Sequence, residues 1–203
     1  MIGVINYGLG NSLSVISAFE EIGIECILLD EPSKLLPSVI GLVIPGVGSF
    51  KEGINKLEES GWKDWLISNG SLNIPVLGIC LGMQLLFESS EESPDVIGLG
   101  LIKGNVSRLN SGNEPVPNMG WRRISVNKIN ELLLDIENNS FYHVHTFGVK
   151  NISRNSIASI FFNLEKINVV VQSNKLFGVQ FHPEKSLKQG LKILDNFYKI
   201  CRK

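Results

Sequence analysis

Residues 75–87 of the chain read PVLGICLGMQLLF, an apolar run of strand length that leads directly into a helical pattern. The run ends at Ile79, and beyond Cys80 three leucines recur at the spacing of one helix face. A strand that passes at once into a helix needs a sharp turn, and the glycines on both sides of the cysteine supply permissive backbone for it. The stretch therefore predicts a strand–turn–helix unit with a cysteine at its apex.

The spacing of Gly78, Cys80 and Gly82 is G-x-C-x-G, the cysteine counterpart of the G-x-S-x-G nucleophile elbow. A thiol at the start of a helix also lies near the positive end of the helix dipole, which favours the thiolate form. This pattern by itself leaves two interpretations open. Cys80 is either a catalytic nucleophile or a buried structural cysteine, a common fate of free cysteines.

The composition describes an ordinary globular chain. Its 203 residues are 43% hydrophobic and 19% charged, enough for one core and too few for a convincing second domain. The net charge of −1 gives no reason to expect nucleic acid or an anionic membrane as a partner. No apolar run reaches the roughly 18 residues of a spanning helix, and the start, MIGVIN, lacks the basic region of a signal peptide. We expect a single domain over residues 1–203, located in the cytoplasm.

Strand and helix patterns alternate over the first 90 residues, and the remainder is mostly strand until a last helical pattern from about Ser186. This order predicts an α/β fold: a mostly parallel central sheet with helices on both faces and strand-rich insertions. The three widely spaced cysteines (Cys26, Cys80 and Cys201) fit neither a disulfide framework nor a metal site. We expect no metal and no cofactor.

Two glycine-rich turns follow the early strands. The first, around Gly8 and Gly10, invites a dinucleotide-binding interpretation, but the fingerprint needs a third glycine where Leu13 stands. The second reads PGVGS at residues 45–49. Glycines on both sides of Val47 make several peptide orientations accessible, which is useful where an N–H has to face a developing anion. A plain strand-to-helix turn is the alternative interpretation of this segment.

A second chemical motif, GVQFHPEKS, occupies residues 178–186. His182 and Glu184 stand two apart in a segment that Pro183 biases toward extended backbone, so both side chains project to the same side. Glu184 can then reach one imidazole nitrogen while the other faces outward, as in nucleophilic triads. A His near a Glu is often only structural, but its combination with a cysteine elbow favours a catalytic Cys80–His182–Glu184 triad.

The pairing of PVLGICLGMQLLFE with GVQFHPEKS resembles the class I (triad) glutamine amidotransferases. The similarity extends to IGVINYGLGN, LVIPGVGSF, GLGLIKG, VPNMGW and YHVHTF, and so covers nearly the whole chain. The GMQLLFESSEE and PNMGW blocks are most similar to the glutaminase subunits of histidine biosynthesis. The resemblance implies hydrolysis of L-glutamine to glutamate and ammonia through a cysteine thioester. It also implies transfer of the ammonia to a separate (β/α)8-barrel cyclase subunit in a heterodimer.

The resemblance also assigns roles to individual residues. Cys80 would be the nucleophile, His182 the general base and acid, and Glu184 the group that orients His182. Oxyanion donors would come from the backbone of Leu81 and of Val47 or Gly48. The implied glutamine contacts are Gln84, Glu92, His145 and Thr146, and the implied docking surface comprises Asn118, Met119 and Trp121.

The chain departs from the family pattern at several positions. Phe147 replaces a tyrosine, Asn6 stands where an Asp is usual, Asn118 where a His is usual, and Arg122 where an Asn is common. These departures keep open a paralogous glutaminase that supplies ammonia for amidating a surface-polysaccharide sugar or another metabolite. A non-catalytic partner subunit and a stand-alone cysteine peptidase or glutamyl hydrolase are further alternatives. The intact triad argues against the former, and the PNMGW block gives no reason to expect a peptide groove.

Overall fold

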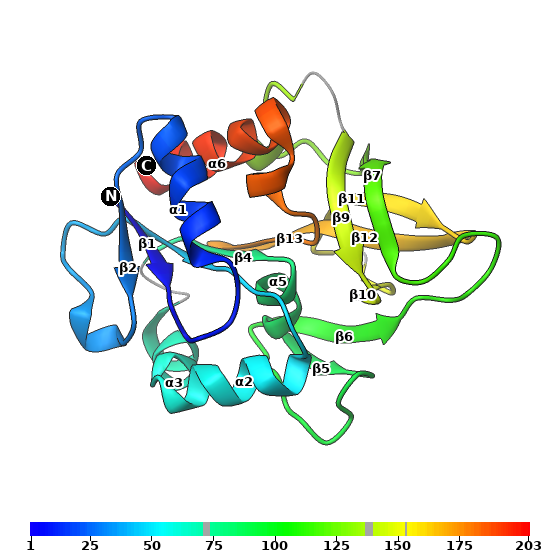
Figure 1. The fold of residues 1–203 in the computed structure, drawn as a ribbon, viewed down its shortest axis with the longest axis horizontal. Coiled ribbons are helices and arrows are strands. Elements are labelled where there is room, and N and C mark those ends of the chain that lie inside the picture. Colours follow the sequence, from blue (N-terminus) through cyan, green and yellow to red (C-terminus); the bar gives the residue numbers. More distant parts are fainter. Residues whose placement is uncertain (71–73, 137–139, 153) are drawn as a thin grey trace.

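The computed structural model describes residues 1–70, 74–136, 140–152 and 154–203. Within these residues, eleven strands form one sheet in the order β2-β1-β3-β4-β13-β12-β10-β6-β5, with β11 joined to β12 and β8 to β11 (Figure 1). Two further strands, β7 and β9, form a separate antiparallel ribbon. The strands are β1 Ile2–Ile5, β2 Cys26–Leu29, β3 Gly41–Ile44, β4 Val76–Ile79, β5 Phe87–Ser90, β6 Ile102–Arg108, β7 Asn118–Arg123, β8 Ser125–Val126, β9 Ser140–His145, β10 Phe147–Val149, β11 Ser156–Phe162, β12 Glu165–Ser173 and β13 Leu176–Val179.

The parallel half of the sheet consists of β2, β1, β3, β4 and β13. Each of these strands is short, and β1, β3, β4 and β13 are buried along their whole length, as expected for strands covered on both faces. Strand β12 pairs antiparallel with β13 and begins the strand-rich half. The predicted α/β class is thus confirmed, with mostly antiparallel strands added beyond β13 and one parallel pair, β5 and β6, at the far edge.

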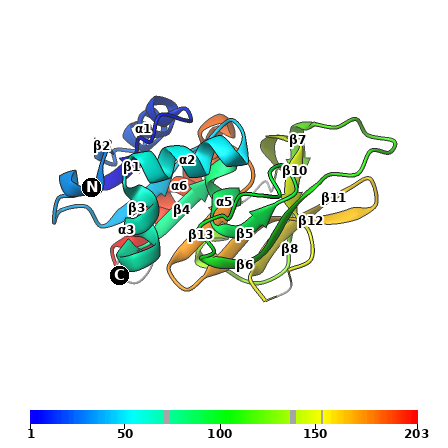
Figure 2. The ribbon, with the colours of Figure 1, turned by 90° about the horizontal axis from the view of Figure 1, so that it is seen from below.

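Helices cover both faces of the parallel strands. Helices α1 and α6 pack on one face and α2 and α3 on the other, as Figure 1 and the view from below in Figure 2 show. Successive side chains along a strand point to opposite faces of the sheet and so contribute to both cores. Val43, for example, lies in the core under α1 and α6, while its neighbour Leu42 lies in the core under α2. The helices are α1 Ser12–Glu21, α2 Phe50–Glu59, α3 Trp62–Trp65, α5 Leu81–Leu85 and α6 Leu187–Cys201, with single-turn segments at Pro32–Lys34, Glu131–Leu133 and Pro183–Lys185 and a π-helical turn at Leu66–Gly70.

The elbow after β4 depends on the two glycines that the sequence places around Cys80. A Cβ atom on Gly82 would lie 1.9 Å from the carbonyl oxygen of Ile44, and one on Gly78 would lie 2.5 Å from the carbonyl oxygen of Gly82. Both contacts are with backbone atoms, which cannot move aside without distorting β3 or the elbow itself. Only glycine at these positions lets α5 begin directly above its own strand.

Candidate active site

The two chemical motifs meet because their strands are neighbours. Strands β4 and β13 run parallel, with Ile79 paired to Val179, so Cys80 and His182 leave the sheet at the same edge. The Cys80 backbone N–H continues this pairing with a 2.8 Å hydrogen bond to the carbonyl oxygen of Val179. Residues separated by about half the chain are thereby brought to one site, at the carboxyl ends of the parallel strands, where open α/β sheets place their functional groups.

Cys80 adopts a backbone conformation that side chains seldom occupy, with φ of 54° and ψ of −107°. Positive φ in a non-glycine residue marks a strained turn, which costs on the order of 1–3 kcal/mol and persists only when the surroundings enforce it. Here the enforcing elements are β4 on one side and α5 on the other. The strain lifts the thiol above the end of the sheet, as the elbow pattern predicts.

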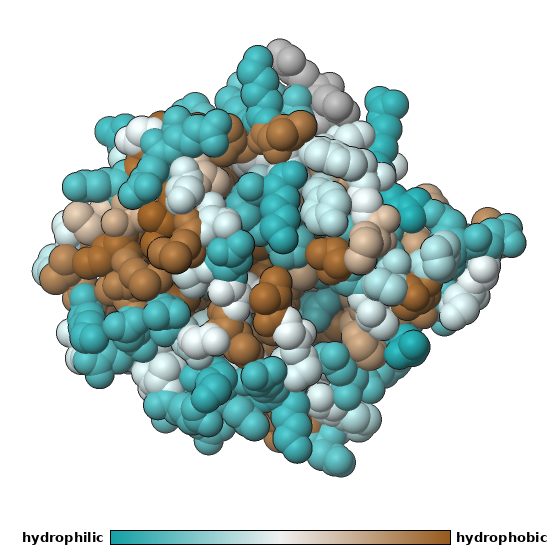
Figure 3. Space-filling model, in the orientation of Figure 1, coloured by the Kyte–Doolittle hydropathy of each residue, from teal (hydrophilic) through white to brown (hydrophobic). Residues whose placement is uncertain are grey.

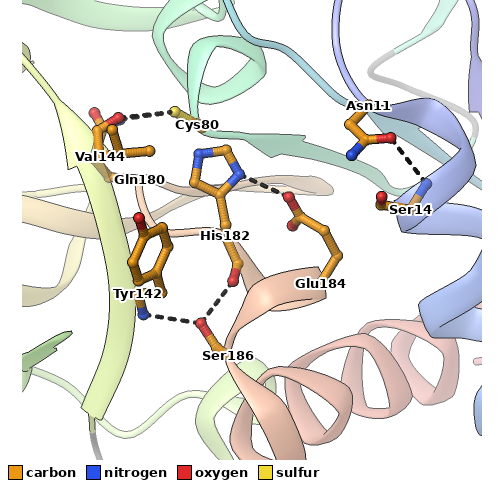
Figure 4. Close-up of polar contacts among 9 residues, drawn as sticks. All are labelled: Asn11, Ser14, Cys80, Tyr142, Val144, Gln180, His182, Glu184 and Ser186. Atoms are coloured by element: carbon orange, nitrogen blue, oxygen red, sulfur yellow. Dashed lines mark hydrogen bonds and ion pairs between the residues drawn. The ribbon is translucent and has the colours of Figure 1, made fainter. Parts of the chain in front are cut away.

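His182 and Glu184 form a buried pair beside the thiol. The Nδ1 atom of His182 lies 2.7 Å from Oε1 of Glu184, and both side chains are almost completely buried. Figure 4 shows the other ring nitrogen, Nε2, turned toward the Cys80 sulfur. Burial lowers the pKa of His182, but the Cys80 sulfur and the Glu184 carboxylate outweigh burial and raise the pKa to about 9. The arrangement favours an imidazolium beside the sulfur.

Backbone contacts from neighbouring elements hold His182 in place. The buried Ser186 hydroxyl donates a 2.6 Å hydrogen bond to the His182 carbonyl oxygen and accepts one of 3.0 Å from the Tyr142 N–H (Figure 4). The His182 N–H in turn donates to the Tyr142 carbonyl oxygen at 2.9 Å. Strand β9 and the start of α6 therefore clamp the histidine from two sides.

A cavity of about 330 Å³ opens in front of the thiol. It brings together residues that the sequence analysis assigned to separate roles: Cys80 and His182; the oxyanion candidates Val47, Gly48 and Leu81; and the glutamine-contact candidates Gln84, Glu92, His145 and Thr146. Glu184 lies outside the lining, behind His182. Leu81 is the first residue of α5, so its N–H has no partner within the helix and is free of the helix to face an oxyanion.

The four candidate glutamine contacts differ in how much of their hydrogen-bonding capacity is already used. The Gln84 amide nitrogen donates to the Phe147 carbonyl oxygen at 3.0 Å and to Oε1 of Gln180 at 3.1 Å. One Glu92 oxygen accepts from the Phe50 N–H at the start of α2, at 2.6 Å. His145 is committed through both ring nitrogens, whereas Thr146 supplies a hydroxyl at the cavity wall.

His145 belongs to a polar network that the sequence analysis did not foresee. Its Nδ1 atom lies 2.9 Å from the Phe147 carbonyl oxygen, which can only accept, so Nδ1 carries the hydrogen. Its Nε2 atom then accepts from the Asn118 amide at 3.0 Å, and the Asn118 oxygen accepts from Nε of Arg122 at 2.8 Å. Burial is the main cause that lowers the pKa of His145 to about 4, so the ring is neutral.

The structure separates the three residues expected at a docking surface. Met119 and Trp121 project outward from β7, with 59% and 50% of their surface exposed. Asn118 is fully buried and faces His145, so the expectation that its side chain lies on the docking surface is corrected. The alternation along a strand explains the difference, because successive side chains point to opposite faces.

The described residues contain no group of three or more His, Cys, Asp or Glu side chains arranged to hold a metal ion, and no helix among them is long and apolar enough to cross a membrane. The strained cysteine, the buried His–Glu pair and the cavity in front of the thiol form the arrangement of the class of enzymes that works by covalent catalysis from a cysteine. Within that class, the chain belongs to the class-I glutamine amidotransferase family, whose family model matches residues 3–201.

Individual relatives agree with this family. The chain is 43% identical to the imidazole glycerol phosphate synthase subunit HisH of Geobacillus sp. (strain WCH70), over 98% of this chain and 97% of that protein. It is 39% identical to the HisH subunit of Methanothermobacter thermautotrophicus over the full length of both. A crystal structure of a glutamine amidotransferase superposes with a TM-score of 0.75 over 100% of both chains at 19% identity, which shows the shared fold.

Proposed function

We propose that the chain is the glutaminase subunit of an imidazole glycerol phosphate synthase and supplies ammonia for histidine biosynthesis. The observation that carries the proposal is the cavity itself, which joins Cys80 and His182 to the family's glutamine-contact positions. Full-length relatives at about 40% identity carry that subunit name. Three free cysteines among the described residues are ordinary in a reducing compartment, so we place the activity in the cytoplasm.

The proposed reaction has two halves. His182 takes the proton of Cys80, and the sulfur attacks the side-chain carboxamide carbon of glutamine, whose oxygen becomes an oxyanion facing the Leu81 N–H. Collapse of this intermediate breaks the carbon–nitrogen bond, and His182 returns the proton to the leaving ammonia. Water then attacks the thioester, with His182 accepting a proton and passing it to the departing sulfur, and glutamate is released. Glu184 holds the ring and balances its charge throughout.

A second oxyanion donor would come from the Val47–Gly48 segment at the cavity wall. Gly48 has a φ of 120°, and a Cβ on it would meet only a flexible Glu52 carboxylate, so the surroundings leave this peptide room to reorient. Loss of one oxyanion donor typically lowers kcat by roughly 10²–10³. We propose that the lone subunit is nearly idle and that its partner favours the active orientation of this peptide.

The proposed partner is a (β/α)8-barrel cyclase that forms a heterodimer with this chain and receives ammonia through a closed channel. Several large apolar side chains are exposed, among them Val47, which lines the cavity, and Leu13, Met119, Trp121 and Leu187. Figure 3 shows apolar groups on the face that it draws, among them one in its middle over the region of α5. Exposed apolar residues, one of them at the cavity itself, suit a partner that also excludes water from the ammonia.

The paralogous glutaminase for polysaccharide amidation is the alternative that the departures from the family pattern keep open. Two of those departures lie in the same network, since Arg122 donates to Asn118, which in turn holds His145. They therefore maintain the wall of the glutamine cavity and do not by themselves favour another acceptor.

The test is steady-state glutaminase activity of the chain alone, with the purified barrel cyclase, and with cyclase plus its acceptor ligand. We expect activity to rise at each step, and Trp121→Ala to weaken cyclase binding. Ile67→Ala, at 48% exposure on the segment after α3, is the matched control and should bind normally. Equal kcat in the three conditions would refute the switching proposal, and activation only by an amidating partner would support the alternative.

A further inference from the structure

Gln180 is a fully buried polar residue that none of the steps above uses. It follows β13 directly and precedes His182 by two residues, so it shares the edge of the sheet at which the nucleophile lies. Its side-chain nitrogen, Nε2, lies 3.8 Å from the Cys80 sulfur, within hydrogen-bonding range for sulfur. A buried amide directed at a reactive sulfur calls for a chemical explanation.

The orientation of this amide is determined by its neighbours. The Phe147 carbonyl oxygen can only accept, so the Gln84 group 3.0 Å from it has to be the amide nitrogen. The same nitrogen lies 3.1 Å from the Gln180 side chain, which therefore presents its oxygen to Gln84. The remaining end of Gln180, the NH₂ group, has to face Cys80. The Phe147 carbonyl oxygen thus fixes the orientation of the Gln84 amide, and the Gln84 amide in turn fixes the Gln180 amide so that its N–H faces the sulfur.

The sulfur also has an acceptor within reach. The carbonyl oxygen of Val144 lies 3.9 Å from the Cys80 sulfur, in a position to accept from the S–H of the neutral thiol. Deprotonation removes that hydrogen and leaves a negative sulfur, which Val144 repels and which the Gln180 N–H attracts. The sulfur therefore has one neighbour suited to each protonation state, in addition to His182.

We propose that Gln180 is a further catalytic residue, whose side-chain N–H donates to the Cys80 thiolate and so raises the population of the reactive form. The inference deepens the proposed glutaminase mechanism and rests on Cys80 being its nucleophile. Hydrogen bonds to charged groups contribute more than neutral ones, and the loss of this one should raise the midpoint of thiolate formation by about one pH unit. The same chain of contacts ties the sulfur to Gln84, at the wall of the glutamine cavity.

The test compares Gln180→Glu with the wild-type chain. Glutamate has the shape of glutamine and still accepts from Gln84, but it presents no N–H to the sulfur at neutral pH. Gln180→Met removes the donor without adding charge and serves as a second variant. Gln172→Glu is the matched control, since Gln172 lies on β12 and bonds Asn130 and Asn174, away from the cavity.

The first readout is the rate at which iodoacetamide alkylates Cys80 as a function of pH. Burial raises the pKa of Cys26 and Cys201 to about 12, so these thiols react slowly, and mass spectrometry separates the three sites. We expect the profile of Gln180→Met to move to higher pH by about one unit, that of Gln180→Glu to move at least as far because a carboxylate also repels the thiolate, and that of Gln172→Glu to stay in place. Profiles that superimpose on the wild type would overturn the proposal, whatever the loss in activity.

The second readout is glutaminase kcat/KM with the barrel cyclase present, followed from neutral to mildly alkaline pH. A thiolate-stabilising role predicts a loss of about tenfold near pH 7 that shrinks as pH rises. A purely structural role predicts an equal loss at every pH. Alkylation of Cys80 needs no substrate, so the first readout tests the role of Gln180 even if the chain is not a glutaminase. Failure of the Gln180 proposal can therefore be distinguished from failure of the glutaminase proposal.

A third measurement needs no variant. In the wild-type chain labelled with ¹⁵N at glutamine side chains, alkylation of Cys80 abolishes the thiolate. The Gln180 amide signal should then shift strongly while the Gln172 signal does not. An unchanged Gln180 signal would overturn the proposal even if both Gln180 variants failed to fold.

Discussion

The hydroxyl of Tyr7 donates a 2.7 Å hydrogen bond to the carbonyl oxygen of Pro45, at the base of the proposed oxyanion loop. The next residue, Gly46, is enclosed as well, since a Cβ on it would lie 2.7 Å from the Tyr7 oxygen and 2.8 Å from Cβ of Leu81. Val47, one residue further on, is 44% exposed. The loop therefore has a fixed base and a free tip, and any reorientation begins after Gly46.

Tyr7→Phe should remove the hydrogen bond that holds the loop at Pro45 and leave the packing of the ring unchanged. The ring stays packed, while the buried Pro45 carbonyl loses its partner, which costs about 1–3 kcal/mol of unfolding free energy. We expect kcat with the cyclase to fall severalfold at unchanged KM, because the oxyanion donor is held less firmly. Tyr198→Phe on α6 is the control for loss of a tyrosine hydroxyl. A destabilised Tyr7→Phe chain with wild-type kcat would assign the hydroxyl a structural role only.

Glu184→Gln should preserve the fold and impair catalysis. The amide has the shape of the carboxylate but carries no charge, so it cannot balance the His182 imidazolium and the pKa of His182 should fall from about 9. We expect kcat to drop by about 10²-fold or more, yet less than in His182→Ala, which also removes the base itself. Circular dichroism checks the fold, and a fully active Glu184→Gln enzyme would contradict the proposed orienting role.

The strained backbone of Cys80 predicts an inverted order of stability between two small replacements. At ordinary positions Gly is less stabilising than Ala by roughly 0.5–1 kcal/mol. At φ 54° and ψ −107° an alanine retains the strain of a Cβ, whereas glycine relieves it. Urea unfolding should therefore show Cys80→Gly to be at least as stable as Cys80→Ala. A clear deficit for the glycine variant would show that the backbone at this residue is relaxed.

Two buried imidazoles should make the fold sensitive to acid. Burial is the main cause that lowers the pKa of His143 and His145, from an ordinary 6.5 to about 4 for His145. The unfolded chain then takes up protons before the folded one, so stability is lost as pH falls from about 6.5 toward 4. His143→Leu should reduce the drop in urea midpoint between about pH 7.5 and about pH 5. An unchanged drop in the urea midpoint would show that His143 does not contribute to the loss of stability in acid.

His182 should act with the opposite sign. Its folded-state pKa of about 9 exceeds 6.5, so its contribution is complete below about pH 6.5 and disappears as pH rises through about 9. Cys80→Ala removes the sulfur that raises this pKa and should flatten the alkaline limb of the stability profile. Equal alkaline limbs in Cys80→Ala and wild type would show that Cys80 does not set the pKa of His182.

The sequence predicted the parts of the site that are local in the chain. The elbow could be read from Gly78 and Gly82, because it depends on backbone preferences of neighbours. The contact between His182 and Glu184 was expected, but the expected extended backbone was wrong, since Pro183–Lys185 form a single helical turn that brings the two side chains together. The contact between Gln180 and Cys80 could not be read, because it depends on which strand of the sheet lies beside β4. Asn118 was misplaced for a similar reason, since its inward orientation follows from the pairing of β7 with β9.

Strand β13 is the last strand along the chain, yet it occupies the middle of the sheet, between β4 and β12. A ribosome therefore adds Cys80 about a hundred residues before His182, and the nascent chain holds β4 with one edge unpaired until β13 emerges. Pairing of β4 with β13, which are far apart in the sequence, is expected to slow folding. It also means that no truncated product that lacks β13 and His182 can assemble the proposed triad and consume glutamine.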